Sequence, residues 1–258
     1  MPTPNYTLGR GKVYFARFTA GQTPGPFRYV GNSPEFSLAV ETEMLDHFNA
    51  DSGLRQKDAS LALETTRTGT LVCDDIQVEN VALFFLGSAS VLTTASASAL
   101  TEDLDAVEPG MFYQIGLTES NKVGLRGLAN VSVESNPAAT TYVAGTDYNI
   151  NLDTGMLEII EGGGIASGDD ITVNYDVSAT TQQQIISGDN PVEGALRFVA
   201  DNPRGENRDI FLPYCKITPN GDFALKGDDW QQLSFSLEAM KPTVGEAVYV
   251  NGRPVAGA

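Results

Sequence analysis

The residues that could most readily bind a metal ion lie in a polar segment at 147–158. Four oxygen-bearing side chains stand there at alternate positions: Asp147, Asn149, Asn151 and Asp153. Glu158 follows where a calcium-binding loop would place its last ligand, so calcium is one candidate. Leu152, however, occupies the position at which such a loop requires glycine, and no flanking helices are expected. The same alternation is typical of a β-hairpin, which we favour.

A catalytic site would have to depend on His47, the sole histidine of the chain. One histidine cannot supply a His-based zinc cluster or a common metal triad. A Ser-His-Asp triad would place His47 in a charged segment with no Gly-x-Ser-x-Gly turn nearby. The sequence therefore favours neither metal chemistry nor nucleophilic catalysis at this residue.

Paired acids and a glycine run are the remaining candidates. The acid pairs at 74–75 and 169–170 could in principle serve as the acid and base of a glycosidase. Neighbouring residues of a strand point to opposite faces, however, and Asp74 suits a helix N-cap better. The glycine run 162–164 lacks the lysine and the helix that a phosphate-binding loop needs. We therefore predict a structural or interaction protein with no catalytic residues, metal or cofactor, and not an enzyme.

The charge of the chain is strongly negative and unevenly spread. Of a formal net charge of −17, residues 101–180 carry −11, with thirteen acids against Lys122 and Arg126. This argues against a protein that grips nucleic acid, which requires clustered basic side chains. It suits a surface past which DNA moves without sticking, although excess acid also keeps an abundant protein soluble.

The cysteines and the apolar runs bear on the compartment. Cys73 and Cys215 lie far apart, and we expect two buried free thiols, as in a reducing cytoplasm, and no disulfide. The longest purely apolar run, 81–86, is much too short to span a bilayer. We expect no membrane partner.

Alternating apolar and polar residues dominate the chain and predict β-strands. Leu233, Phe235 and Leu237 alternate with polar residues, the period of a strand with one wet face. Strands are also expected near 36–41 and 60–72. The segment 44–58 between them is long and mixes charged with apolar residues, so we predict a docking loop there.

One helix is expected, at about 75–86. Asp74 fits its N-cap, and Gln77 three residues later would complete a capping box. Gly87 is placed to end the helix. A single short helix among many strands would close one flank of a sandwich or barrel.

A small inserted β domain is expected at 127–178. Four short strands separated by turn residues occur in this stretch. The predicted fold is therefore all-β: a β-sandwich or barrel-forming sheet built from 1–126 and 179–258, one flanking α-helix, and the insert.

Eight blocks follow one another in an order shared with a known family. They are 8–15, 31–36, 45–48, 51–58, 80–87, 110–116, 145–148 and 219–230. Their residues are packing and turn signatures and form no reactive site. Together they resemble the major tail tube proteins of long, non-contractile-tailed (siphovirus-like) bacteriophages, across most of the chain.

The resemblance implies a structural virion protein with the tail tube fold. Such subunits form rings of six, and the rings stack into a hollow tail tube through which DNA is ejected into the host. One sheet of each subunit joins its neighbours around the lumen, which leaves no free edges. The implied partners are further copies of the chain, the tape measure, tail terminator and tail tip proteins, and genomic DNA that passes without specific binding. The implied location is the phage tail, assembled in the host cytoplasm.

The resemblance also suggests which residues make contacts. A long strand-connecting loop of such subunits reaches the next ring, and 44–58 is the candidate here. The expected ring-to-ring residues are Leu45, Asp46, His47, Phe48, Leu54, Arg55, Lys57 and Asp58. The lumen of such tubes tends to be acidic, and four acids stand out of phase with apolar neighbours on expected strands: Glu35, Glu41, Glu64 and Glu238.

The alternative is a carbohydrate-binding or adhesin β module, with the insert as its recognition domain. Such a site would use exposed aromatic residues, of which the insert offers Tyr142, Tyr148 and Tyr175. Rings or tubes would select the tail tube, whereas a monomer retained on a polysaccharide column would select the module.

Overall fold

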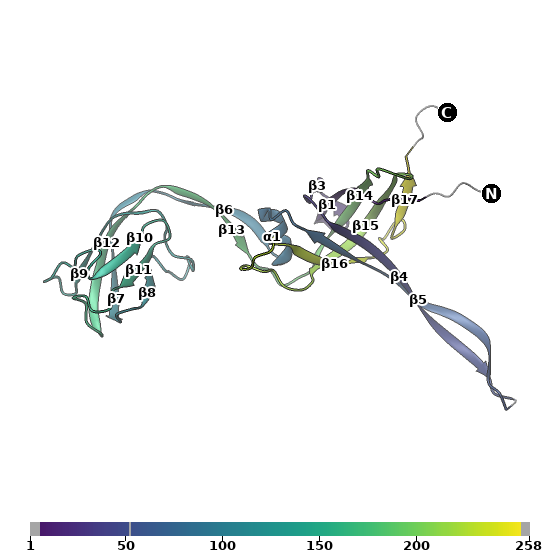
Figure 1. Cartoon of the computed structure of the whole chain (residues 1–258), viewed down its shortest axis with the longest axis horizontal. Coiled ribbons are helices and arrows are strands. Elements are labelled where there is room, and N and C mark those ends of the chain that lie inside the picture. The colour runs from purple at the N-terminus through teal and green to yellow at the C-terminus, as the bar shows by residue number, and fades with distance from the viewer. Residues whose placement is uncertain (1–5, 52, 254–258) are drawn as a thin grey trace. The chain divides into compact units, whose positions relative to one another are not determined.

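The computed structural model describes residues 6–51 and 53–253 and is mostly β, with one short helix (Figure 1). The all-β fold class predicted from the sequence is confirmed. The chain divides into two compact units. Unit 1 comprises Met1–Ser90 and Ile185–Ala258, and unit 2 comprises Val91–Gln184.

Unit 1 is built on one antiparallel sheet of nine strands. Along its main path the order is β2 (Thr23–Pro24), β1 (Gly11–Ala20), β14 (Val192–Ala200), β15 (Arg208–Pro219), β16 (Leu233–Ala239), β5 (Gln56–Cys73) and β4 (Glu35–Asn49). Two further strands lie off this path: β3 (Arg28–Tyr29) pairs with β1, and β17 (Tyr249–Gly252) pairs with β15. Within the described residues, β4 therefore forms one edge of the sheet.

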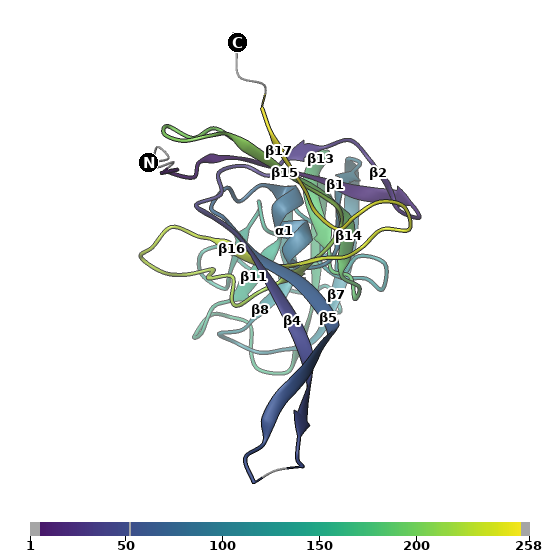
Figure 2. The same ribbon diagram turned by 90° about the vertical axis from the view of Figure 1, so that its right-hand side faces the viewer.

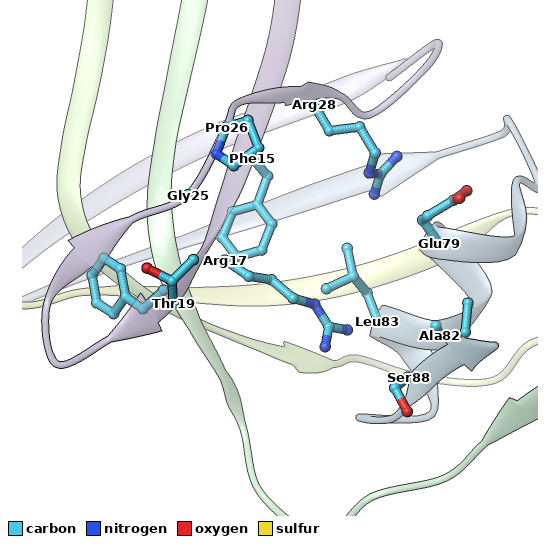
Figure 3. Close-up of a pocket in the computed structure, with 12 residues that line it drawn as sticks. Phe15, Arg17, Thr19, Gly25, Pro26, Arg28, Glu79, Ala82, Leu83 and Ser88 are labelled. Atoms are coloured by element: carbon cyan, nitrogen blue, oxygen red, sulfur yellow. The ribbon is translucent and has the colours of Figure 1, made fainter.

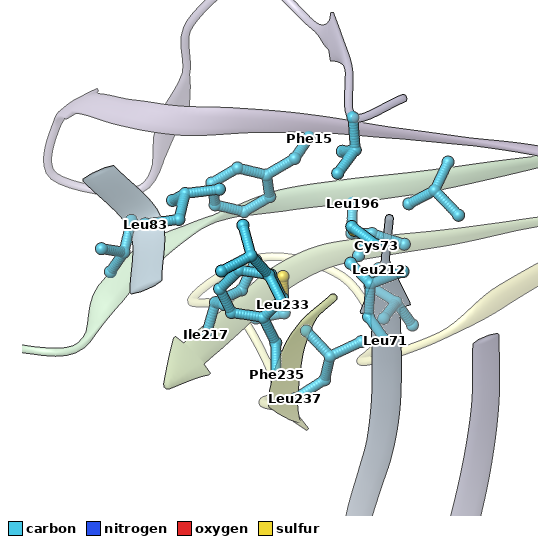
Figure 4. Close-up of a cluster of buried hydrophobic side chains, with 14 of the residues drawn as sticks. Phe15, Leu71, Cys73, Leu83, Leu196, Leu212, Ile217, Leu233, Phe235 and Leu237 are labelled. Carbon is cyan, nitrogen blue, oxygen red and sulfur yellow. The ribbon is translucent and has the colours of Figure 1, made fainter. Parts of the chain in front are cut away.

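The core of unit 1 lies on one face of this sheet. On β16, Leu233, Phe235 and Leu237 are buried, while the residues between them are not, as the alternation predicts. The helix α1 (Val78–Phe84) packs on this face, where the Phe84 ring lies 6.2 Å from the Phe235 ring. Figure 4 shows Leu83 of the helix facing the buried side chains of several strands.

The helix is shorter than the sequence predicted. It begins at Val78 after Gln77, which makes no side-chain cap, so the expected capping box is wrong. The Asp74 carboxylate instead accepts hydrogen bonds of 2.8 and 2.7 Å from Asn32 Nδ2. These hydrogen bonds join Asp74, just after β5, to the loop that contains Asn32. The Asp74 carboxylate therefore does not cap a helix that begins at 75.

The residue just after the helix, Gly87, must be glycine because of a close contact. Its φ does not lie in the left-handed region that favours glycine. Its N–H donates to the Ala82 carbonyl over 2.8 Å and closes the last turn. A Cβ at Gly87 would lie 1.9 Å from the Ile186 carbonyl oxygen, so only glycine allows this close approach. The preceding Leu86 adopts the positive φ.

Unit 2 consists of two three-stranded antiparallel sheets around a second core. One has the order β7 (Ala97–Val107), β12 (Asp169–Val177) and β9 (Leu128–Ser135), and the other β10 (Tyr148–Asn151), β11 (Met156–Ile159) and β8 (Phe112–Gln114). Strands β6 (Ser88–Thr94) and β13 (Thr180–Ile186) pair with each other where the chain passes between the units. The core residues come from both sheets and include Val133, Leu157, Ile159, Ile171 and Val173.

The boundaries of unit 2 differ from those of the predicted insert, 127–178. The unit begins at Val91 because β7 pairs with β12 along most of its length and supplies a third of one sheet. In the same way β8 pairs with β11. The stretch before residue 127, expected to belong to the larger domain, therefore completes the smaller one.

The prediction of a docking loop at 44–58 is wrong about its secondary structure. Strand β4 continues to Asn49 and β5 begins at Gln56, so most of the segment is a paired hairpin with a short connection (Figure 1). Backbone hydrogen bonding between the strands favours this extension even without a core beneath it.

Among the described residues, no helix has the length and apolar character needed to cross a membrane.

Candidate functional site: the β4–β5 hairpin and the polar face of the sheet

The β4–β5 hairpin extends beyond the rest of the unit 1 sheet (Figure 2). Every described residue from Ala39 to Thr65 is exposed, so neither face of this part of the hairpin packs on the chain itself. A two-stranded ribbon without a covered face is marginally stable in water. Its length therefore contributes little to the core of unit 1 and offers surface to another molecule.

Large apolar side chains are concentrated on this hairpin. Those with more than a third of their surface exposed are Val40, Met44, Leu45, Phe48, Leu54, Leu61 and Leu63, at 40–71%. The Arg55 guanidinium lies 5.3 Å from the centre of the Phe48 ring and covers part of it. Several large apolar side chains exposed on one element indicate an interaction site.

Polar contacts fix the conformation of the hairpin near its tip. Asp46 accepts hydrogen bonds of 2.6 Å from Lys57 Nζ and from the Ser60 hydroxyl. These two donors, Lys57 first, lower the pKa of Asp46. His47 Nδ1 lies 2.5 Å from Asp58 Oδ1.

All eight residues expected at the ring-to-ring contact lie on this hairpin. Leu45 to Phe48 belong to β4, Lys57 and Asp58 belong to β5, and Leu54 and Arg55 lie in the connection. The structure brings them together at one end of unit 1. That they contact another ring stays a prediction.

The four expected lumen acids share one face of the sheet. The register pairs Glu41 with Thr66 and Glu43 with Glu64, so alternate residues of β4 and β5 lie together on this face. Glu35, Glu41 and Glu64 follow that alternation. Glu238 joins them because it pairs with Thr68, which in turn pairs with Ala39. This is the face opposite the core of unit 1, and we call it the polar face.

A row of paired residues crosses the polar face over five strands. It runs through Glu193, Lys216, Glu238, Thr68 and Ala39. The Tyr214 hydroxyl donates to Glu193 Oε1 over 3.0 Å, and Lys216 Nζ lies 3.8 Å from the same oxygen. Burial and then the neighbouring Glu193 raise the pKa of Tyr214.

The polar face is hollowed where β4, β5, β15 and β16 meet. A depression of about 670 Å³ is lined by five small hydroxyl side chains, Lys216 and Glu238, and also by apolar residues that include Leu38, Pro191 and Leu237. Serine and threonine on β4, β5, β15 and β16 contribute hydroxyl groups that water can reach at this depression. Such a face can adjoin water or a passing polyanion more readily than it can bury itself against a core.

Sequence reasoning missed a second depression of unit 1, of about 450 Å³, between β1 and α1. Figure 3 shows Arg17 and Arg28 reaching toward the helix on either side of Leu83. The signal was present, because Arg17 occupies a phase of β1 at which Val13 and Phe15 are buried. A charged side chain at a position where the strand otherwise buries apolar residues indicates a polar contact or a binding site.

The sequence also gave no sign that Trp230 would be exposed.

In the calcium-site candidate of unit 2, backbone N–H groups of the same chain bind the carboxylate of the first expected ligand, Asp147. Asp147 accepts hydrogen bonds of 2.7 Å from the Val143 and Gly164 N–H groups, which lower its pKa. Strands β10 and β11 pair, which confirms the hairpin favoured from the sequence. In the described part of the chain, no group of three or more His, Cys, Asp or Glu residues is arranged to hold a metal.

The fold and the site thus define a two-unit, mostly β protein with an exposed hairpin and a polar sheet face. A family profile matches residues 6–247 and therefore both units. The chain belongs to this family, which is described as "Protein of unknown function UCP028589". No curated protein matches the chain.

Proposed function

We propose that this protein is the subunit of a phage tail tube: a structural virion protein that assembles into stacked hexameric rings and conducts DNA into the host. The observation that carries the proposal is the β4–β5 hairpin, which is exposed on both faces from Ala39 to Thr65. A lone monomer gains little from holding so much apolar surface in water. Insertion against the next ring would cover it.

The free edge of the sheet supports ring closure. Strand β4 has one neighbour, β5, among the described residues, and its 15 residues leave a long row of unpaired backbone groups. The opposite edge is formed by β1 with the short strands β2 and β3. Joining one edge to the other edge of the next copy is a head-to-tail contact that closes into a ring. The sheets would then form one barrel without free edges.

The acids of the polar face suit the lumen of that barrel. Glu43 stands directly opposite Glu64, and Glu41 follows on the same face. Like charges directly opposite one another destabilise an isolated hairpin. The Glu43–Glu64 pair therefore does not stabilise the fold, which favours a functional role for these acids. A ring of such carboxylates repels phosphate and gives DNA no adhesive minimum along the axis. The polar face in this arrangement lines the channel, and the core face with α1 lies outside it.

Two further parts of the proposal concern partners and location. The tape measure protein would occupy the channel before DNA does, and terminator and tip proteins would meet the two ends of the tube. These partners are what the resemblance to tail tube proteins implies, and each end of a stacked tube exposes one half of the stacking contact. The assembled protein would reside in the phage tail.

The test is imaging of the purified chain over a range of concentrations. We expect rings and hollow tubes by negative-stain electron microscopy, with a native mass for the smallest assembly of six chains. A protein that stays monomeric at high concentration would refute the proposal. Retention of that monomer on a polysaccharide column would select the carbohydrate-binding alternative.

A further inference from the structure

The depression between β1 and α1 combines apolar walls with two cations. Phe15, Phe18 and Leu83 line it together with Arg17 and Arg28. Arg17 donates to the Gly87 carbonyl over 2.8 Å, and Arg28 donates to Asn80 Oδ1 over 2.7 Å (Figure 3). These contacts hold both guanidinium groups in place. We call this depression the arginine pocket.

The lining of the arginine pocket carries a net positive charge, because Arg17 and Arg28 face a single acid of the lining, Glu79. Within the described residues, neither Arg17 nor Arg28 forms an ion pair. Burial lowers the pKa of both guanidinium groups, and the neighbouring Arg28 lowers that of Arg17 further. For Arg28, Glu79 and then Cys73 and Asp75 oppose this shift. Two neighbouring guanidinium groups against one carboxylate leave a positive charge that favours an anion from another molecule.

The loop 220–232 between β15 and β16 carries the complementary groups. Trp230, the sole tryptophan, is 94% exposed, and Asp228 and Asp229 precede it. Gln231 Nε2 donates to the Ala224 carbonyl over 2.9 Å, and the Phe223 ring lies 5.8 Å from the ring of Phe84. The loop is thus tied to the core while its indole is presented to solvent. Tryptophan is favoured at the centre of protein interfaces.

We propose that Trp230 of one copy inserts into the arginine pocket of a second copy, with Asp228 and Asp229 facing Arg17 and Arg28. The indole can pack on the apolar walls and stack on a guanidinium, while the carboxylates offset the net positive charge of the lining. Charge complementarity argues for this occupant, because the pocket lining carries two cations against one acid and the loop presents two neighbouring carboxylates beside the indole.

The two halves of the contact are placed for head-to-tail association. In Figure 2 the loop 220–232 extends from one side of unit 1, whereas the turn between β1 and β2 beside the arginine pocket lies on the opposite side. A patch that meets a different patch on the next copy generates rings or filaments. The inference rests on the proposed function and names one contact of the ring.

The sole tryptophan allows a direct test on the full-length wild-type chain. We expect the fluorescence maximum of Trp230 to move to shorter wavelength as assembly proceeds, and its quenching by acrylamide to fall severalfold. Assembly measured by light scattering without either change would overturn the inference and leave the tail tube standing. Absence of assembly at any concentration would overturn both.

Two variants locate the contact. Trp230→Ala removes the indole, and Arg17→Gln removes one cation while it keeps a side chain that can donate to Gly87. Each alone should raise the concentration required for assembly by about 30-fold or more, the loss typical of an interface hot spot. Phe112→Ala, which removes an aromatic residue of unit 2 that is 59% exposed, is the matched control and should assemble normally.

Mixing the two variants gives the sharpest outcome. A head-to-tail contact leaves each variant one intact half, so an equimolar mixture should form heterodimers by sedimentation velocity where each variant alone stays monomeric. Thermal unfolding of each variant shows that it is folded. Normal assembly of folded Trp230→Ala, or a mixture that behaves as its two components do alone, would overturn the proposal.

Discussion

Removal of the exposed hairpin should separate folding from assembly. Glu43 and Glu64 are cross-strand partners, so the two strands can be rejoined there by a two-residue Asn-Gly turn that replaces residues 44–63. Every described side chain removed is exposed. We therefore expect the free energy of unfolding of unit 1 to change by less than about 1 kcal/mol, as for most surface changes.

The expected loss of assembly follows from the apolar residues removed. Met44, Leu45, Phe48, Leu61 and Leu63 are 40–63% exposed. Complete burial of such a side chain stabilises by roughly 1.5–3 kcal/mol, so covering the exposed half contributes about 1 kcal/mol each. Five of them contribute roughly 5 kcal/mol per contact before the cost of ordering, equivalent to between about three and four orders of magnitude in the association constant.

Sedimentation velocity and electron microscopy measure this loss, and urea unfolding measures the stability. A control variant with Met111→Ala and Phe112→Ala removes exposed apolar surface from unit 2 instead and should assemble as the wild type does. Tubes of normal length from the folded hairpin variant would refute the reasoning.

The remaining predictions concern charge, the smaller unit, the thiols and acid. Glu41→Lys with Glu64→Lys should give tails that assemble but deliver DNA slowly or not at all, because a lumen lined with lysine binds phosphate; unchanged infectivity would contradict the lumen assignment. Replacement of unit 2 by a Gly-Ser bridge should still allow rings on electron micrographs, because unit 2 has a hydrophobic core of its own, and failure of the soluble remainder to form rings would place unit 2 in the tube wall. Burial raises the pKa of Cys73 to about 11 and of Cys215 to about 12, so a thiol reagent at pH 8 should label neither until denaturant is added, and rapid labelling would contradict their burial. The pKa of Asp46 is lowered in the folded chain, so its contribution is present above the ordinary aspartate pKa and disappears as the pH falls below about 4; hydrogen exchange should then accelerate in the hairpin before the core.

The sequence predicted the strands that have one buried face. The alternation around Phe235 has a physical cause, since burial on one side and water on the other impose a period of two. The phase of Glu35 and Glu238 could be inferred for the same reason, since their neighbours Phe36 and Leu237 pack in the core. The strand register then places Glu41 and Glu64 on the same polar face. No such constraint acts on 44–58, where both faces are wet, so its pairing could not be inferred from polarity.

Other differences arise from partners that are remote in sequence. Asp74 has the character of a helix cap, but Asn32 takes its carboxylate, so the helix starts at Val78. The boundary of unit 2 depends on the pairing of β7 with β12, across more than sixty residues of chain. The arginine pocket needs β1 and α1 side by side, and a single charged residue in an apolar phase was its only trace in the sequence.

Cryo-electron microscopy of tubes grown from the purified wild-type chain tests the central claim most directly. We predict stacked six-subunit rings in which the β4–β5 hairpin contacts the next ring and Glu35, Glu41, Glu64 and Glu238 face a continuous channel. A protein that remains monomeric under all assembly conditions, or a tube whose channel is lined by the α1 side of the sheet, would contradict the account.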